Sequence, residues 1–145
     1  MHSNTYTFLY AIVISVITAI LLAFAAEGLR PLQEANVRLD NKTSILRAVR
    51  FTSTERDEIE VMYRNQVEEA VLDYTGEKMT GIKAEDIVLK KELEKPLEQR
   101  RLPLYIFTSP DFTRKFIIPM QGTGLWGPVF GYSSIDEDFN TVYGA

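Results

Sequence analysis

The most constraining feature of the sequence is an uncharged, apolar run near its N-terminus, from Phe8 to Ala26. As a helix rising about 1.5 Å per residue, this run would be roughly 28 Å long, close to the roughly 30 Å hydrocarbon core of a bilayer. All 16 Lys and Arg and all 20 Asp and Glu follow it. The sequence therefore predicts a single-pass membrane protein, with nearly everything after Ala26 outside the hydrocarbon.

A cleaved signal peptide is the alternative interpretation of this run, because Ala23-Phe24-Ala25 resembles a cleavage site. Two features argue against it. No Lys or Arg precedes the run, and the run is longer than the roughly 7–15 apolar residues that are usual in signal peptides. A retained membrane anchor is therefore the preferred interpretation.

Small side chains recur at every fourth position of the run. They are Ala11, Ser15, Ala19 and Ala23. On a helix they would form one stripe that lets another membrane helix approach closely. The stripe predicts partner subunits within the membrane, while the rest of the helix would contact lipid. Small residues are also common in membrane helices without any such role.

The charges that flank the run say little about its orientation. Arg30, Arg38 and Lys42 follow it, and the positive-inside rule alone would place the following polypeptide in the cytoplasm. Long domains, however, translocate largely regardless of charge, and the neighbouring carboxylates dilute the local positive excess.

Composition excludes several classes of function. A net charge of -4 without a long basic run offers no electrostatic footprint for nucleic acid. The chain has no Cys and one His, His2, so thiol chemistry, a Ser–His–Asp triad and histidine metal sites have no credible members. The clustered carboxylates of 55–60 and 68–69 are interpreted as solvated helix residues.

Helical periodicity continues after the span. One amphipathic helix is predicted from Pro31 to about Val49, and a second from Glu55 to near Gly76, with Thr52-Ser53-Thr54 supplying its cap. The charged run 83–101 is expected to be a solvated connector with at most one helix and no function.

Beyond Leu102 the pattern changes to short β-branched and aromatic segments between turn residues. Residues 104–107, 116–118 and 129–132 are predicted to be three strands of one sheet, and 141–143 to begin a further strand. The sheet is therefore expected to be unfinished. Either its strands are completed by a partner, or the sequence is a fragment, and the fragment is the preferred interpretation.

The segment Gly122–Gly127 matches the G-x-G-x-x-G pattern of dinucleotide-binding turns. That fingerprint needs a helix to begin at the glycines, whereas here Pro128 and a β-like run follow. The segment is therefore interpreted as a hairpin connection, with Trp126 expected in the core or an interface. An exposed aromatic residue on such a turn can also stack on a planar cofactor, and that alternative stays open.

Two ordered blocks of residues resemble the C subunit of the sodium-translocating NADH:quinone reductase, a bacterial respiratory complex. The blocks are Gly28-Leu29-Arg30, Gln33, Asn36, Leu39-Asp40 and Ile45-Leu46, followed by Arg100-Arg101, Tyr105, Phe116-Ile117-Ile118-Pro119, Gly122, Gly124-Leu125-Trp126 and Asn140-Thr141-Val142. Together with the span they cover about half of the chain.

This resemblance implies a subunit of the bacterial inner membrane with one span and a periplasmic domain that carries flavin mononucleotide (FMN). The flavin would relay electrons between subunits and couple quinone reduction to sodium export. In the family FMN is joined to a threonine of a Ser-Gly-Ala-Thr motif, which is absent from these 145 residues. Only noncovalent flavin contacts are therefore expected here, at Gly124, Leu125 and Trp126.

The resulting expectation is an α+β chain in three segments. Residues 1–27 form the tail and membrane helix, 28–101 a juxtamembrane helical segment, and 102–145 the start of an antiparallel-sheet, FMN-binding-type domain. Two other functions are considered. One is the G subunit of the Rnf electron-transport complex, which resembles this subunit. The other is a non-redox membrane-anchored scaffold, if the chain truly ends at Ala145.

Overall fold

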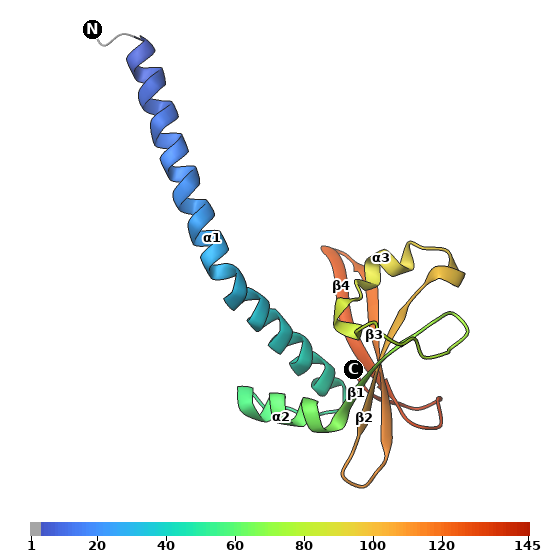
Figure 1. The fold of residues 1–145 in the computed structure, drawn as a ribbon. Helices are drawn as coiled ribbons and strands as arrows, with labels where there is room; N and C mark the ends of the chain where they lie inside the picture. Colours follow the sequence, from blue (N-terminus) through green and yellow to red (C-terminus); the bar gives the residue numbers. More distant parts are fainter. Residues whose placement is uncertain (1–3) are drawn as a thin grey trace. The chain divides into compact units, whose positions relative to one another are not determined.

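The computed structural model describes residues 4–145 and has an α+β architecture (Figure 1). Its elements are α1 (Asn4–Ala48), α2 (Arg56–Gln66), β1 (Val67–Leu72), the 3-10 turn η1 (Ala84–Asp86), α3 (Leu89–Leu93), the 3-10 turn η2 (Leu97–Gln99), β2 (Leu102–Thr108), β3 (Arg114–Gly124), β4 (Gly127–Ile135) and β5 (Val142–Gly144). Contacts divide the chain into two compact units at Arg38 and Leu39. Each unit is described separately below.

The first unit is the N-terminal part of α1. An 18-residue window of this helix has a mean hydropathy of 2.7, so α1 is long and apolar enough to cross a bilayer, the one such helix in residues 4–145. The separate helix predicted from Pro31 is instead a continuation of α1, since Pro31 lies inside it. Proline removes one backbone hydrogen bond there. Ion pairs of Arg30 with Glu27 (3.6 Å) and Glu34 (3.1 Å) link the turns on either side. His2 lies outside the described residues.

The second unit begins with the last turns of α1, in which Leu46 and Ala48 are completely buried. The helix ends in two backbone hydrogen bonds that form a Schellman motif. The amide of Phe51 donates to the carbonyl of Leu46 (3.1 Å), and the amide of Arg50 donates to that of Arg47 (2.8 Å). Arg50 takes the left-handed conformation, φ 65°, which glycine usually supplies at this position. The end of α1 is therefore a packed part of the second unit.

The second predicted helix is shorter than expected, which corrects the sequence prediction. α2 ends at Gln66, and the residues from Val67 to Leu72 form β1 instead of further helical turns. β1 pairs with β2 in antiparallel register, from Val67 opposite Phe107 to Leu72 opposite Leu102. These non-local hydrogen bonds outweigh the local helical periodicity.

The predicted cap of α2 is also wrong. Glu55 is the N-cap residue, and no side chain caps the helix. Instead, the hydroxyl of Ser53 accepts a hydrogen bond from the amide of Glu55 (3.1 Å) and donates to the carboxylate of Glu58 (2.5 Å).

The five strands form one antiparallel sheet in the order β1-β2-β3-β4-β5. The predicted strands at 104–107, 116–118 and 129–132 lie in β2, β3 and β4, and the strand predicted at 141–143 overlaps β5. The antiparallel sheet predicted from the sequence is confirmed. β5 passes so close to the end of α1 that a Cβ atom on Gly144 would collide with the carbonyl oxygen of Ala48.

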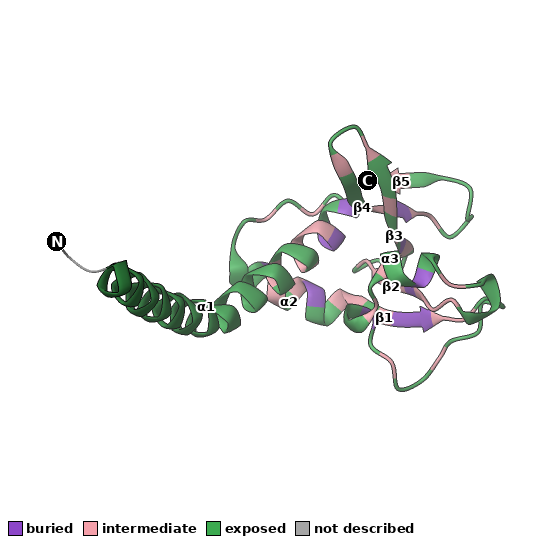
Figure 2. Ribbon diagram, turned by 90° about the horizontal axis from the view of Figure 1, so that it is seen from above, coloured by how far each residue is buried: buried purple, intermediate pink, exposed green. Residues whose placement is uncertain are grey.

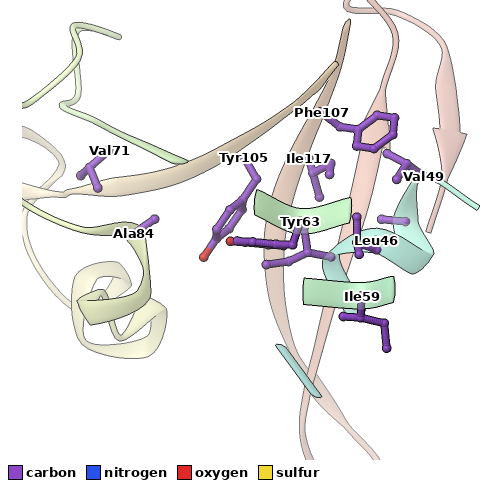
Figure 3. Packing of buried hydrophobic residues seen from close by; sticks show 11 residues of the cluster. Leu46, Val49, Ile59, Tyr63, Val71, Ala84, Tyr105, Phe107 and Ile117 are labelled. Atoms are coloured by element: carbon purple, nitrogen blue, oxygen red, sulfur yellow. The ribbon is translucent and has the colours of Figure 1, made fainter. Parts of the chain in front are cut away.

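The core lies between one face of this sheet and the helical segments. Leu46 of α1, Ile59 and Tyr63 of α2, and Tyr105 and Ile117 of the sheet pack there (Figure 3). The buried positions gather in this part of the second unit, and the exposed positions extend along α1 (Figure 2). The charged connector is only partly solvated, because Ala84 and Glu92 are each 3% exposed.

Candidate functional site

The glycine-rich segment is a tight hairpin, as its sequence predicts. β3 ends at Gly124, β4 begins at the paired Gly127, and Leu125 and Trp126 form the turn between them. A Cβ atom on Gly124 would lie 2.7 Å from Cγ2 of Val129, and Gly127 has a φ of 143°. Both glycines are therefore required by the turn itself, and they need no phosphate ligand to explain them.

The two turn side chains are the most exposed large apolar groups of the described chain. Leu125 is 91% exposed and Trp126 is 96% exposed. The indole therefore lies outside the core, so the expected packing of Trp126 in the core is wrong. Its expected place in an interface with another molecule stays a prediction. Its two faces are open to a ligand or to a partner.

The hairpin that carries this turn extends beyond the rest of the sheet. β2 pairs with β3 only up to Ile117, and the register of β3 with β4 continues to Gly124. No charged residue occurs from Phe116 to Ile135. Met120, Val129 and Phe130 of this extension are about half exposed or more. The extension is thus a neutral ribbon that presents apolar side chains on both strands, a surface suited to an apolar ligand or partner.

A cavity of about 700 Å³ lies at the base of the ribbon. Its apolar wall includes Tyr105, Met120, Phe130 and Tyr132, and its polar rim includes Asp40, Arg47 and Lys90. The volume is within the range of small-molecule sites, roughly 300–1,000 Å³. The predicted contact residues Gly124, Leu125 and Trp126 do not line it, so the structure does not bring turn and cavity together as one site.

Two tyrosines of the sheet, buried Tyr105 and partly buried Tyr132, line this cavity. The rings of Tyr105 and Tyr132 meet edge to face with their centroids 6.0 Å apart. Burial raises the pKa of both phenols above the ordinary value. Burial and the hydrogen bond that Tyr63 donates to Glu69 (2.8 Å) raise the pKa of Tyr63 as well. These phenols therefore stay protonated at physiological pH and serve as packing and hydrogen-bonding groups.

The clustered carboxylates of α2 and β1 have structural partners. Glu60 pairs with Lys42 (2.6 Å), Glu68 pairs with Lys78 (2.5 Å), and Glu69 accepts from a buried tyrosine. Within residues 4–145, no group of three or more His, Asp or Glu side chains could hold a metal ion. Glu60, Glu68 and Glu69 therefore have structural roles in the fold.

Glu92 is the one buried carboxylate of the described residues, and sequence reasoning missed it. Its side chain accepts hydrogen bonds from Lys95 (2.7 Å) and from the backbone amide and guanidinium of Arg101 (3.1 Å each). Burial would raise the pKa of Glu92, but these donors together outweigh it and hold the pKa below its ordinary value. The cluster ties α3 to the start of β2, which is a structural role.

The small-residue stripe predicted for the membrane helix is present on α1. Ala11, Ser15, Ala19 and Ala23 all lie in the helix and are exposed in the chain by itself. Their four-residue spacing keeps them on one side of the helix. The stripe can therefore receive another helix.

Comparison with curated proteins finds C subunits of the Na(+)-translocating NADH-quinone reductase among the relatives of this chain, while no protein-family model matches it. The C subunit of the Na(+)-translocating NADH-quinone reductase from Vibrio anguillarum is 27% identical over 95% of this chain and 60% of its own length. The C subunit from Pseudomonas aeruginosa is 25% identical over 99% of this chain and 62% of its own length. The chain thus spans about 60% of the length of these relatives.

Solved structures agree with this likeness. The crystal structure of the C subunit from Parabacteroides distasonis is 30% identical, with a TM-score of 0.69 over 79% of this chain and 55% of that chain. NqrC from Shewanella oneidensis, 18% identical, shares the fold with a TM-score of 0.63 over 74% of this chain and 57% of that chain. The resemblance and the fold class predicted from the sequence are both confirmed.

Proposed function

We propose that this chain acts in a sodium-translocating NADH-quinone reductase complex of the bacterial inner membrane, as a subunit of the C type. The observation that carries the proposal is the extent of the likeness: relatives of this name align with 89–99% of the chain, from the apolar helix to the sheet. The fold of the second unit and the one long apolar helix of the described residues agree with such a membrane-anchored subunit.

One side of the exposed turn has room for a planar cofactor. Trp126 offers an uncovered indole face, and an added Cβ atom on Gly122 would meet nothing within 4 Å, so there is open space beside the turn. Ring stacking on an exposed aromatic residue needs such space. The turn Gly124-Leu125-Trp126 therefore fits noncovalent contact with the isoalloxazine ring of FMN. These 145 residues contain no Ser-Gly-Ala-Thr motif through which the phosphate of FMN could be joined to a threonine.

FMN, when bound, supplies one-electron chemistry, and the chain supplies position and surroundings. Trp126 and Leu125 would cover one face of the ring and exclude water from it. Because β3 and β4 carry no ionised side chain from Phe116 to Ile135, the ribbon would tune the ring through polarity and packing. No acid or base of this chain is needed for electron relay.

Two further parts of the proposal concern the membrane. The stripe Ala11, Ser15, Ala19 and Ala23 would contact helices of other subunits. The second unit would lie in the periplasm, where the electron relay is coupled to sodium export. Glu94 is exposed and the chain contains no Cys. A Glu94→Cys variant in intact cells should therefore react with a membrane-impermeant maleimide, and protection until the inner membrane is permeabilised would contradict the periplasmic placement.

The function is tested in membranes of the native host. Replacing Trp126 with Ala removes the stacking surface, and replacing it with Phe retains one. Sodium-stimulated NADH:quinone reductase activity is expected to fall roughly threefold to tenfold in Trp126→Ala, because the lost ring contact is worth about 0.5–1.5 kcal/mol. In Trp126→Phe the activity is expected to stay within about twofold of the parent's. Tyr74→Ala, which removes another exposed aromatic, is the matched control.

Measurements on the same membranes distinguish a wrong function from a wrong assignment of the site. If deletion of the gene leaves sodium-stimulated activity unchanged, the proposed function is wrong. If deletion abolishes that activity and Trp126→Ala leaves it unchanged, the role in the complex stands and the assignment of Trp126 is wrong.

A further inference from the structure

We draw no further inference here: the strongest candidate, the cavity of about 700 Å³ between the end of α1, the segment 84–90 and the sheet, lies in a chain that spans only about 60% of the length of its curated relatives, and nothing in the structure shows what fills or covers it.

Discussion

The hydroxyl of Ser134 in β4 donates a 2.5 Å hydrogen bond to the carbonyl oxygen of Ala48, the last residue of α1. Both residues are fully buried, and they lie 86 positions apart in the sequence. The bond supplies a partner for one of the carbonyl groups that every helix end leaves unpaired. It fastens the end of α1 to the base of the β3–β4 hairpin, so that the helix end is part of the folded domain.

Replacing Ser134 with Ala should therefore destabilise the second unit. The substitution leaves a buried carbonyl oxygen without its donor, which costs about 1–3 kcal/mol. Chemical unfolding of the full chain in detergent, followed by circular dichroism, measures the loss. Ser133→Ala is the matched control, because the Ser133 hydroxyl makes only a long contact of 3.4 Å with the carbonyl of Gly144. Equal losses in the two variants would show that the bond to Ala48 contributes nothing.

Stability should fall in acid, partly through Glu92. Its pKa is lower in the folded chain than in the unfolded chain, where an ordinary Glu titrates near about 4.3. A carboxyl group of this kind stabilises the fold above its unfolded pKa, and that contribution is lost as the pH falls through the folded pKa. The free energy of unfolding is therefore expected to decline below about pH 5.

A Glu92→Gln variant isolates this contribution. It should be less stable than the parent by about 2 kcal/mol at neutral pH and should show a shallower decline in acid, while Glu94→Gln should follow the parent curve. If the free energy of unfolding of Glu92→Gln declines in acid as steeply as that of the parent, other carboxylates account for the decline. Four other carboxylates could account for it, because hydrogen bonds lower their pKa values as well, that of Asp138 to about 2. They are Asp73, Asp111, Glu137 and Asp138.

The helix stripe leads to a prediction about assembly. Ala19→Leu places a large side chain where a neighbouring helix would approach closely, so co-purification with partner subunits should fall several-fold. Val13→Leu changes the size of a residue of α1 on the side away from the stripe and should leave co-purification unchanged. The measurement is the amount of partner recovered per molecule of tagged chain. Equal recovery with both variants would remove the stripe from the interface.

The features that could be predicted from the sequence are those set by local chemistry. The strands at 104–107 and 116–118 follow from β-branched and aromatic residues between turns. The hairpin at Gly124 follows from glycines and Pro128, which bar the helix that a dinucleotide site needs. The long apolar helix at the start of α1 follows from length and the absence of charge. Each of these signals lies within a few neighbouring residues.

The features that were missed depend on distant partners. The segment Val67–Leu72 has apolar spacing that also suits a helix, and only its pairing with β2 makes it a strand. Glu92 looks like one more solvated charge until Arg101, nine residues later, folds back onto it. The exposure of Trp126 and the left-handed conformations of Phe112 and Phe139 are likewise consequences of the folded backbone.

We propose that this chain is part of a subunit that carries flavin in the reductase. The most direct test is the intact mass of the native protein purified from its own membrane, together with its flavin fluorescence in a denaturing gel. If the proposed function is right, the fluorescence survives denaturation and the intact mass exceeds the 16.6 kDa of these 145 residues by at least the mass of the flavin. A mass near 16.6 kDa without fluorescence would contradict it and would leave a membrane-anchored scaffold.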